Sequence, residues 1–193
     1  MDLLRLQVVI SKYQHNSVEI TVEKLRNKDV VIIPTDTVYG FSGIVPWTED
    51  YIRQIKGREE NKPFIQLIAS PKDIQYYTKE KIDKKYLDLW PGPLTIIVPQ
   101  KEDNTKTIAL RCPDDEWLRK VIELTGFSIY STSVNYSGKE ILSDIYDIVE
   151  EFDTDVALIV DDGDKRDSKA STIISIINGE VKLIRQGELK IDI

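Results

Sequence analysis

The sequence predicts an α/β protein with a mixed sheet flanked by helices. Short apolar runs typical of buried strands alternate with longer segments whose apolar residues recur at helical spacing. Near the end of the chain, Asn178-Gly179 separates two apolar runs, and this dipeptide favours the tight turn of an antiparallel hairpin. Because no internal repeat or linker-like stretch interrupts the pattern, residues 1–193 are expected to form one domain.

The predicted strands are apolar runs that end at polar or turn-forming residues. In chain order they are DVVIIP (29–34), FIQLIA (64–69), LTIIV (94–98), TIALR (107–111), FSIYSTS (127–133), VALIV (156–160), TIISII (172–177) and EVKLIR (180–185).

The predicted helices begin at residues that can cap a helix or open its first turn. They start at Asn16 (with Glu19 completing a capping box), Thr48, Ser70-Pro71, Lys81, Asp114 and Ser143. Gly57 and Gly126 stand where the second and fifth of these helices should end.

The bulk composition is that of an ordinary globular protein, with 41% hydrophobic and 31% charged residues. No apolar run approaches the roughly 20 residues that span a membrane, and the N-terminus lacks the pattern of a secretory signal. The single cysteine, Cys112, excludes an intrachain disulfide and fits a reducing compartment, so we expect a cytoplasmic protein.

Two classes of site are disfavoured by the same counts. One histidine, His15, and one cysteine cannot form a Cys/His zinc site, and they leave few residues for a Ser-His-Asp or Cys-His hydrolase. The net charge of −7 gives little general attraction to nucleic acid, so an anion site must be a local basic cluster.

Polar side chains repeatedly stand at the borders of the predicted strands. They are Thr35, Asp36, Thr37, Arg111, Ser131, Thr132, Ser133, Asn135, Ser171, Thr172 and Arg185. Each cluster alone is also typical of a turn. Several clusters with two arginines among them favour a ligand site, because ligands in α/β proteins gather at strand ends.

A basic stretch, IKGREENKPF, adds Lys56, Arg58 and Lys62. These cations are typical of a solvated helix end, and they are equally suited to clamp phosphate oxygens. The common phosphate-binding glycine motifs are missing from the sequence. Asp36 is expected to accept backbone N–H bonds within its own tight turn.

Seven motifs, in order along the chain, together resemble the YrdC family. They are PTDTVYG (34–40), KGR (56–58) with Lys62-Pro63, PGPLT (91–95), ALRCP (109–113), STSVN-x-SG (131–138), STI (171–173) and RQG (185–187). The resemblance implies a YrdC-like fold: a twisted, mostly parallel mixed sheet around a deep basic cleft. It also implies a nucleotidyltransferase, an L-threonylcarbamoyladenylate synthase of the short form without an extra C-terminal domain.

Such enzymes form threonylcarbamoyl-AMP and pyrophosphate from L-threonine, bicarbonate and ATP, for tRNA threonylcarbamoyladenosine modification. By resemblance, the threonine-binding residues are Thr35, Arg111, Ser131 and Ser171. The ATP-binding residues are Lys56, Arg58, Lys62, Thr107, Ser133, Asn135 and Arg185, with Lys56 and Arg58 the catalytic ones. Mg²⁺ is expected to enter with ATP and not through protein ligands, and a tRNA-modification transferase is the expected downstream partner.

The resemblance also sets expectations for single residues. Arg58→Ala and Arg111→Ala are expected to fold normally, the first weakening ATP binding and the second threonine binding. Ile141 stands where many family members place Ser or Thr, which predicts one nucleotide contact fewer.

Two alternatives remain at this stage. The same basic cleft could serve an RNA-binding module, although the sequence shows no interleaving of aromatic and basic residues around the motifs. A carbamoyl-transfer component like the hydrogenase-maturation enzymes is the other, although the cysteine-rich modules that accompany this domain there are absent.

Overall fold

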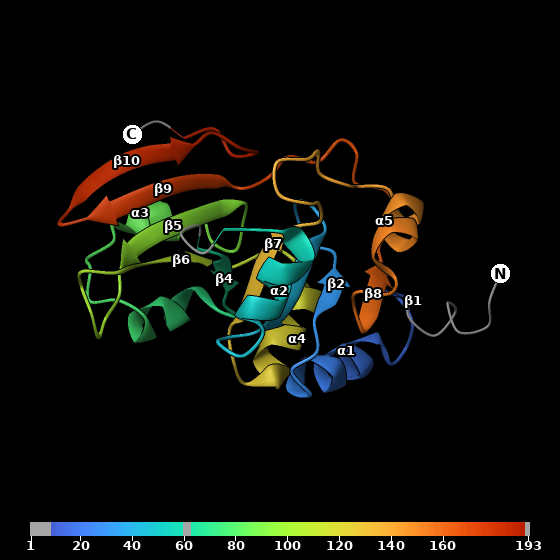
Figure 1. Cartoon of the computed structure of the whole chain (residues 1–193). Coiled ribbons are helices and arrows are strands. Elements are labelled where there is room, and N and C mark those ends of the chain that lie inside the picture. Colours follow the sequence, from blue (N-terminus) through green and yellow to red (C-terminus); the bar gives the residue numbers. More distant parts are fainter. Residues whose placement is uncertain (1–8, 60–62, 192–193) are drawn as a thin grey trace.

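A ten-stranded sheet runs through the structure, which is a computed structural model describing residues 9–59 and 63–191 (Figure 1). From one edge to the other the strands are β1 (Val9–Ser11), β8 (Leu158–Asp161), β2 (Val31–Ile33), β3 (Gly40–Ile44), β7 (Ile129–Ser133), β4 (Ile65–Leu67), β6 (Thr107–Arg111), β5 (Leu94–Pro99), β9 (Thr172–Ile177) and β10 (Glu180–Arg185).

The sheet is mixed, as predicted, but the expectation of a mostly parallel sheet is wrong. Among the described residues, four neighbouring pairs are parallel and five are antiparallel. The connection from β2 to β3 is too short for a crossover, so these strands run antiparallel. The predicted hairpin is confirmed: β9 and β10 pair antiparallel, and Asn178 and Gly179 have φ angles of 54° and 78°.

The helices are those that the sequence predicts, with changes in length and type. They are α1 (Ser17–Arg26), α2 (Glu49–Lys56), the 3₁₀ helix η2 (Pro71–Tyr76), α3 (Lys84–Leu87), α4 (Glu116–Thr125) and α5 (Ile145–Phe152). The helix expected from Lys81 is thus reduced to a single turn. None of the helices in the described part of the chain has the length and apolarity to cross a membrane.

Three predicted helix caps differ from what is observed. The Asn16 side chain caps nothing and instead accepts a hydrogen bond from Gln14. The Thr48 hydroxyl donates back to the Ile44 carbonyl and does not cap α2. Helix α5 is capped by the Asp144 carboxylate, one residue after the predicted Ser143.

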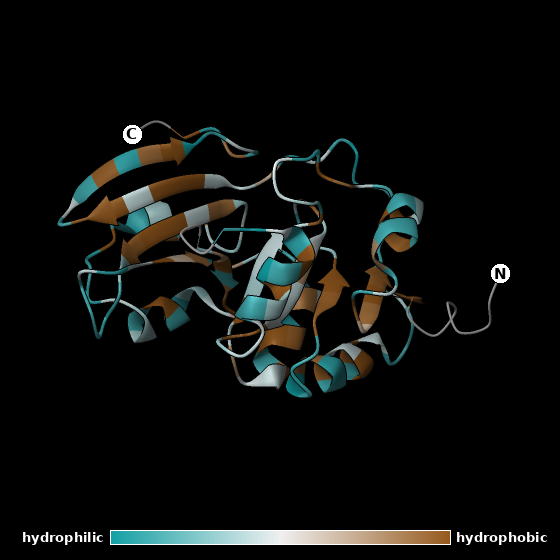
Figure 2. Ribbon diagram, viewed as in Figure 1, coloured by the Kyte–Doolittle hydropathy of each residue, from teal (hydrophilic) through white to brown (hydrophobic). Residues whose placement is uncertain are grey.

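Helices cover both faces of the sheet because the strand side chains alternate. In β2, Ile32 packs in a cluster with residues of α2 and α5, whereas Val31 and Ile33 pack with α1 and α4. A third cluster joins β5, β6 and β9 to η2 and α3. Figure 2 shows the result, with predominantly hydrophobic strands between helices that carry both apolar and polar residues.

Two strands were missed by the sequence analysis, β1 and the central β3. β3 reads GFSGI, with no apolar run or alternation to mark it, yet all five of its residues are buried. Its Gly43 is required by packing, since a Cβ atom there would lie 2.3 Å from the Thr48 Oγ1. Gly43 weakens the strand pattern in the sequence, because glycine disfavours strands. It is explained by the close approach of Thr48, just before α2.

Candidate functional site

One face of the sheet forms the floor of a cavity of about 200 Å³. Ser131, Ile65, Ala109 and Ile97 are register partners on the successive strands β7, β4, β6 and β5, and all four line the cavity. The floor therefore includes positions inside β7, β6 and β5, together with Ile65, the first residue of β4.

The walls of this cavity bring together most of the residues that the sequence predicts. The predicted residues that line it are Thr35, Arg58, Arg111, Ser131, Ser133, Ser171 and Arg185. They come from segments far apart in the chain, so the expectation that these side chains share one pocket is confirmed.

The turn after β2 fixes the orientation of Arg111, which is only 4% exposed. The guanidinium donates through Nη1 to the Thr37 hydroxyl at 2.8 Å, through Nη2 to the Asp36 carboxylate at 2.5 Å, and through Nε to the Gly92 carbonyl at 3.1 Å. Thr35 in turn contacts Thr37, with 2.9 Å between the two hydroxyl oxygens. Since a guanidinium carries five N–H bonds, two have no acceptor among the described residues and remain for a ligand.

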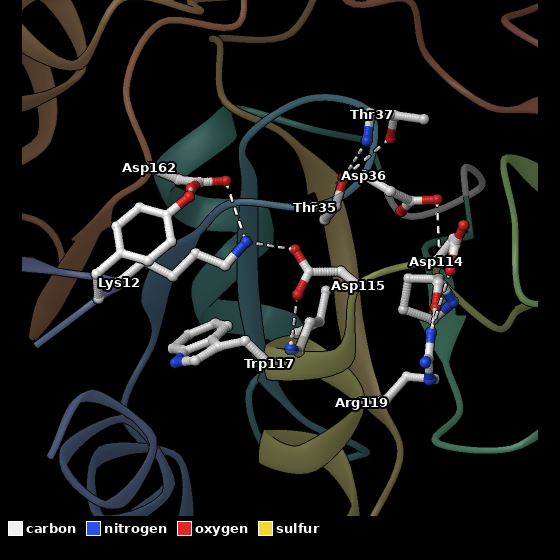
Figure 3. A network of polar contacts seen from close by, with 12 residues as sticks. Lys12, Thr35, Asp36, Thr37, Asp114, Asp115, Trp117, Arg119 and Asp162 are labelled. Carbon is white, nitrogen blue, oxygen red and sulfur yellow. Dashed lines mark hydrogen bonds and ion pairs between the residues drawn. The ribbon is translucent and has the colours of Figure 1, made fainter. Parts of the chain in front are cut away.

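Asp36 also links this turn to the structure behind the site. Its second oxygen accepts the backbone N–H of Asp114 at 3.0 Å, so the expectation of bonds within its own turn is wrong. Asp115, the next residue, caps α4 and pairs with Lys12. Lys12 also pairs with Asp162, which directly follows β8 (Figure 3). The turn that holds Arg111 is thus braced by α4 and by the edge strands.

Lys56 is not among the residues that line the cavity. It is 2% exposed, and its Nζ donates to the Ser133 carbonyl at 2.5 Å and to the carbonyl and side-chain oxygens of Asn135 at 2.8 and 2.9 Å. Burial, with a smaller effect of the Arg58 charge, lowers the pKa of Lys56 to about 8. Lys56 thus holds the loop that carries Ser133, and its contact with the triphosphate stays a prediction.

Arg58 lines the cavity and packs against the ring of Phe64. Its guanidinium lies 5.0 Å from the ring centre of Phe64, and Arg53 lies 4.7 Å from the same ring. One Nη atom of Arg58 donates to the Pro63 carbonyl at 3.1 Å. Burial first, and then the charge of Arg53, lower the pKa of Arg58. An anion in the cavity would relieve this crowding of positive charge.

Ser171 and Arg185 form the opposite wall. Arg185 donates to the Ser171 carbonyl through Nη2 at 2.8 Å and through Nε at 3.1 Å, and the Ser171 hydroxyl lies 2.8 Å from that of Thr95. Burial and the nearby Arg111 charge lower the pKa of Arg185. The motif RQG requires its glycine, because a Cβ atom on Gly187 would lie 2.2 Å from the Ala170 carbonyl oxygen.

Comparison with known proteins decides the family. A family model for the Sua5_yciO_yrdC domain, described as telomere recombination, matches residues 23–187. A protein of Methanocaldococcus jannaschii is 34% identical over 183 residues, which are 90% of this chain and 86% of that protein. The chain belongs to the Sua5/YciO/YrdC family. The predicted family resemblance is confirmed.

Two further matches come from Pyrococcus abyssi. The threonylcarbamoyl-AMP synthase is 32% identical over 181 residues, which are 87% of this chain and 53% of that protein. The crystal structure of P. abyssi Sua5 complexed with L-threonine has a TM-score of 0.81 and 29% identity, over 93% of this chain and 56% of that one. The chain thus spans about half the length of these two relatives.

Among the described residues, the predicted site residues Asn135 and Thr107 do not line the cavity, and neither does Lys56. Lys62 lies outside the described residues, so its role stays a prediction. Thr107 is two residues before Ala109 on the same face of β6, about 7 Å further along the strand. It is exposed and does not line the cavity.

Thr37, Thr95 and Phe64 contribute to the site, although the sequence assigned them no role there. Thr37 and Thr95 were visible within quoted motifs, but which partners they bind depends on segments far away in the sequence. Phe64 showed only the signal of a buried strand residue. Within the described ranges, no group of three or more His, Cys, Asp or Glu side chains is placed to hold a metal ion.

Proposed function

We propose that this chain is a threonylcarbamoyl-AMP synthase, which forms threonylcarbamoyl-AMP and pyrophosphate from L-threonine, bicarbonate and ATP. The observation that carries the proposal is the convergence of Arg111, Arg58 and Arg185 with the hydroxyls of Thr35 and Ser171 on one cavity. Two relatives support the proposal for this chain. They are the threonylcarbamoyl-AMP synthase of P. abyssi and the P. abyssi Sua5 structure complexed with L-threonine.

The proposed threonine site uses the oriented arginine. The two free N–H bonds of Arg111 bind the carboxylate of threonine, because a planar guanidinium matches carboxylate geometry. Thr35, Ser131 and Ser171 offer hydroxyl groups to the remaining polar atoms of the amino acid. Asp36 offsets the charge of Arg111, so this part of the cavity suits a zwitterion.

The proposed chemistry needs no nucleophile from the protein. The threonine amine takes up bicarbonate and releases water, giving a carbamate. A carbamate oxygen then attacks the α-phosphorus of ATP, and the bond from that phosphorus to the bridging oxygen breaks, so that pyrophosphate leaves. Arg58 and Arg185 stabilise the charge that moves onto the phosphate oxygens, which is how positioning and electrostatics act in such transfers.

Mg²⁺ is proposed to enter as part of the ATP substrate, since phosphate oxygens are its usual ligands when it accompanies a nucleotide. Asp36, the carboxylate nearest to Arg111, already accepts hydrogen bonds through both oxygens. A cytoplasmic location, a downstream transferase for tRNA modification and weak RNA binding remain predictions that accompany this proposal.

The test is pyrophosphate release with purified protein. We expect release only when L-threonine, bicarbonate and ATP are all present, and mass spectrometry should identify threonylcarbamoyl-AMP. Three reactions, each lacking one substrate, serve as controls, and replacement of threonine plus bicarbonate by carbamoyl phosphate tests the carbamoyl-transfer alternative. Folded protein that releases no pyrophosphate from the complete mixture would contradict the proposal.

A further inference from the structure

Lys12 is a largely buried cation for which the proposed reaction has no direct use. It directly follows β1, only 13% of its side chain is exposed, and it is not among the residues that line the cavity. Its Nζ atom donates to the Asp115 carboxylate at 2.7 Å and to the Asp162 carboxylate at 3.1 Å (Figure 3). These carboxylates, 8% and 9% exposed, lie beside α4 and β8, so Lys12 joins two separate segments.

The backbone of Lys12 is held in place as well as its side chain. Its N–H donates to the carbonyl of Asp161, the last residue of β8, at 2.8 Å. Its carbonyl accepts the Ser17 hydroxyl at 2.6 Å, and the same hydroxyl accepts the indole N–H of Trp117 in α4 at 2.9 Å. Lys12 is therefore a fixed point from which Asp115 can be positioned.

The two carboxylates depend on Lys12 to different degrees. Without Lys12, Asp162 would keep three hydrogen bonds, which are those with the hydroxyls of Tyr13 and Tyr39 and with the amine of Lys165. The Asp115 carboxylate has one other partner among the described residues, the backbone N–H of Leu118 at 3.0 Å. Loss of Lys12 should therefore release Asp115 more than Asp162.

A short series of contacts leads from Asp115 to the cavity. The preceding residue, Asp114, donates its backbone N–H to one oxygen of Asp36 at 3.0 Å. The other oxygen of Asp36 accepts Arg111 at 2.5 Å. Because Asp114 and Asp115 are adjacent in the chain, a displacement of Asp115 moves the N–H group that holds Asp36. Such supporting hydrogen bonds keep ligand-binding side chains in their productive orientation.

We propose that Lys12 is a positioning residue for the carboxylate of L-threonine. By holding Asp115, it fixes the acceptor Asp36, and Asp36 sets the angle at which Arg111 presents its two remaining N–H bonds. The inference rests on the proposed synthase function, in which Arg111 binds threonine. Arg185, which we assign to phosphate, is held by Ser171 and not by this series of contacts, so ATP binding should depend little on Lys12.

The experiment starts with Lys12→Met, in which methionine fills the space without a charge. The KM for threonine should rise about fivefold and the KM for ATP should stay within about twofold, as expected for a residue that acts on one ligand indirectly. Lys12→Arg keeps the charge between the two carboxylates and should restore the KM for threonine. Lys120→Met is the matched control and should leave both KM values unchanged, because Lys120 is exposed in α4 and pairs with Glu123.

Asp115→Asn tests the route and replaces Lys12→Met if that variant does not fold. Asparagine still caps α4 but removes the charge that pairs with Lys12, so the KM for threonine should rise as in Lys12→Met. Adding Lys12→Met to Asp36→Asn should give the KM of Asp36→Asn alone, because residues that act in series are not additive. If the two effects multiplied instead, Lys12 would act by another route and the inference would be overturned.

Calorimetric titration with L-threonine separates this inference from the proposed function. If the wild type forms the product but Lys12→Met and Asp115→Asn keep its KM for threonine, the inference is overturned and the proposed function stands. A wild type that forms no product, but binds L-threonine more weakly once Lys12 is replaced, would overturn only the proposed function. Equal rises in both KM values, or no recovery in Lys12→Arg, would indicate a general loosening of the site and would also overturn the inference.

Discussion

Arg111 and Arg185 were predicted from the same pattern and line the same cavity, yet their surroundings are opposite. Arg111 is 4% exposed, and one of its acceptors is the carboxylate of Asp36. Arg185 is only partly buried, and its acceptors are the neutral oxygens of Ser171. One arginine is fixed and neutralised, whereas the other keeps its net charge.

The difference shows how one cavity can distinguish two kinds of anion. A guanidinium paired with a carboxylate contributes geometry more than charge, and it binds a zwitterion without attracting polyanions strongly. A guanidinium held by a carbonyl contributes its full charge and suits phosphate. Variants of the two arginines and of the residues that hold them test this assignment of roles.

The largest expected effect is on stability, in Arg111→Ala. Removing one partner of a buried ion pair leaves an uncompensated charge on Asp36 and typically costs about 3–5 kcal/mol of unfolding free energy. The sequence-based expectation that this variant folds normally is therefore revised. Urea denaturation measures the loss, and the double variant with Asp36→Asn should recover part of it. An unchanged midpoint in the single variant would show that the pair contributes little.

Arg185→Ala should produce the converse result. Because this side chain is only partly buried and has no carboxylate partner in the described residues, its loss leaves no buried charge unpaired, and the urea midpoint should stay close to that of the wild type. The KM for ATP should rise about 10-fold, the loss expected for one charge-assisted contact. Steady-state kinetics with each substrate varied in turn provide the measurement. A larger change in the KM for threonine than for ATP would reverse the assignment of the two arginines.

Elements that depend on local sequence patterns could be predicted from the sequence, whereas those that depend on contacts between distant residues could not. Apolar runs such as VVII and TIISII identify their strands because burial acts on each residue locally. The glycine-rich β3 was missed because its stability comes from pairing with β2 and β7. The hydrogen-bond partners of the cavity residues could not be predicted for the same reason, because they lie far away in the sequence.

Lys56 illustrates this limit at the level of one residue. Its motif indicated a phosphate ligand, but the chain folds Ser133 and Asn135 onto its amine, 77 and 79 residues away in sequence. The residue types needed for phosphate binding were therefore predictable, whereas the division of work among them was not. Burial and hydrogen-bond partners decide that division, and both depend on the tertiary structure.

Asp36→Asn should have a smaller effect than either arginine variant. The amide oxygen can still accept one hydrogen bond, from Arg111 or from the Asp114 N–H, but the charge that offsets Arg111 is lost. We expect the KM for threonine to rise about fivefold, since one charged hydrogen bond is weakened. Competing anions such as phosphate should inhibit this variant more strongly than the wild type. No change in anion inhibition would indicate that Asp36 orients Arg111 without setting the net charge of the cavity.

The smallest expected effect is a change of activity with pH. It tests whether the neutral oxygens of Ser133 and Asn135 are enough to keep the buried amine of Lys56 protonated. Burial, and secondarily the charge of Arg58, lower the pKa of Lys56 to about 8 from 10.5. Between these values the unfolded chain binds the proton that the folded chain has released, so the contribution of Lys56 to stability rises with pH. A neutral amine, however, donates only two hydrogen bonds, and Lys56 makes three to Ser133 and Asn135.

The KM for ATP should therefore increase a few-fold as pH rises through 8, without a fall in the stability contribution of Lys56. Kinetics and thermal unfolding measured over the same pH series reveal this divergence. The control is Lys56→Met, which fills the buried space without a titrating group and should flatten the dependence of the KM on pH. If Lys56→Met kept the wild-type profile, another group would be responsible. The hydrogen bonds from Lys56 to the Ser133 and Asn135 carbonyls would then have a structural role only. The hydrogen bonds from Arg185 to the Ser171 carbonyl, in contrast, position a charge in the cavity.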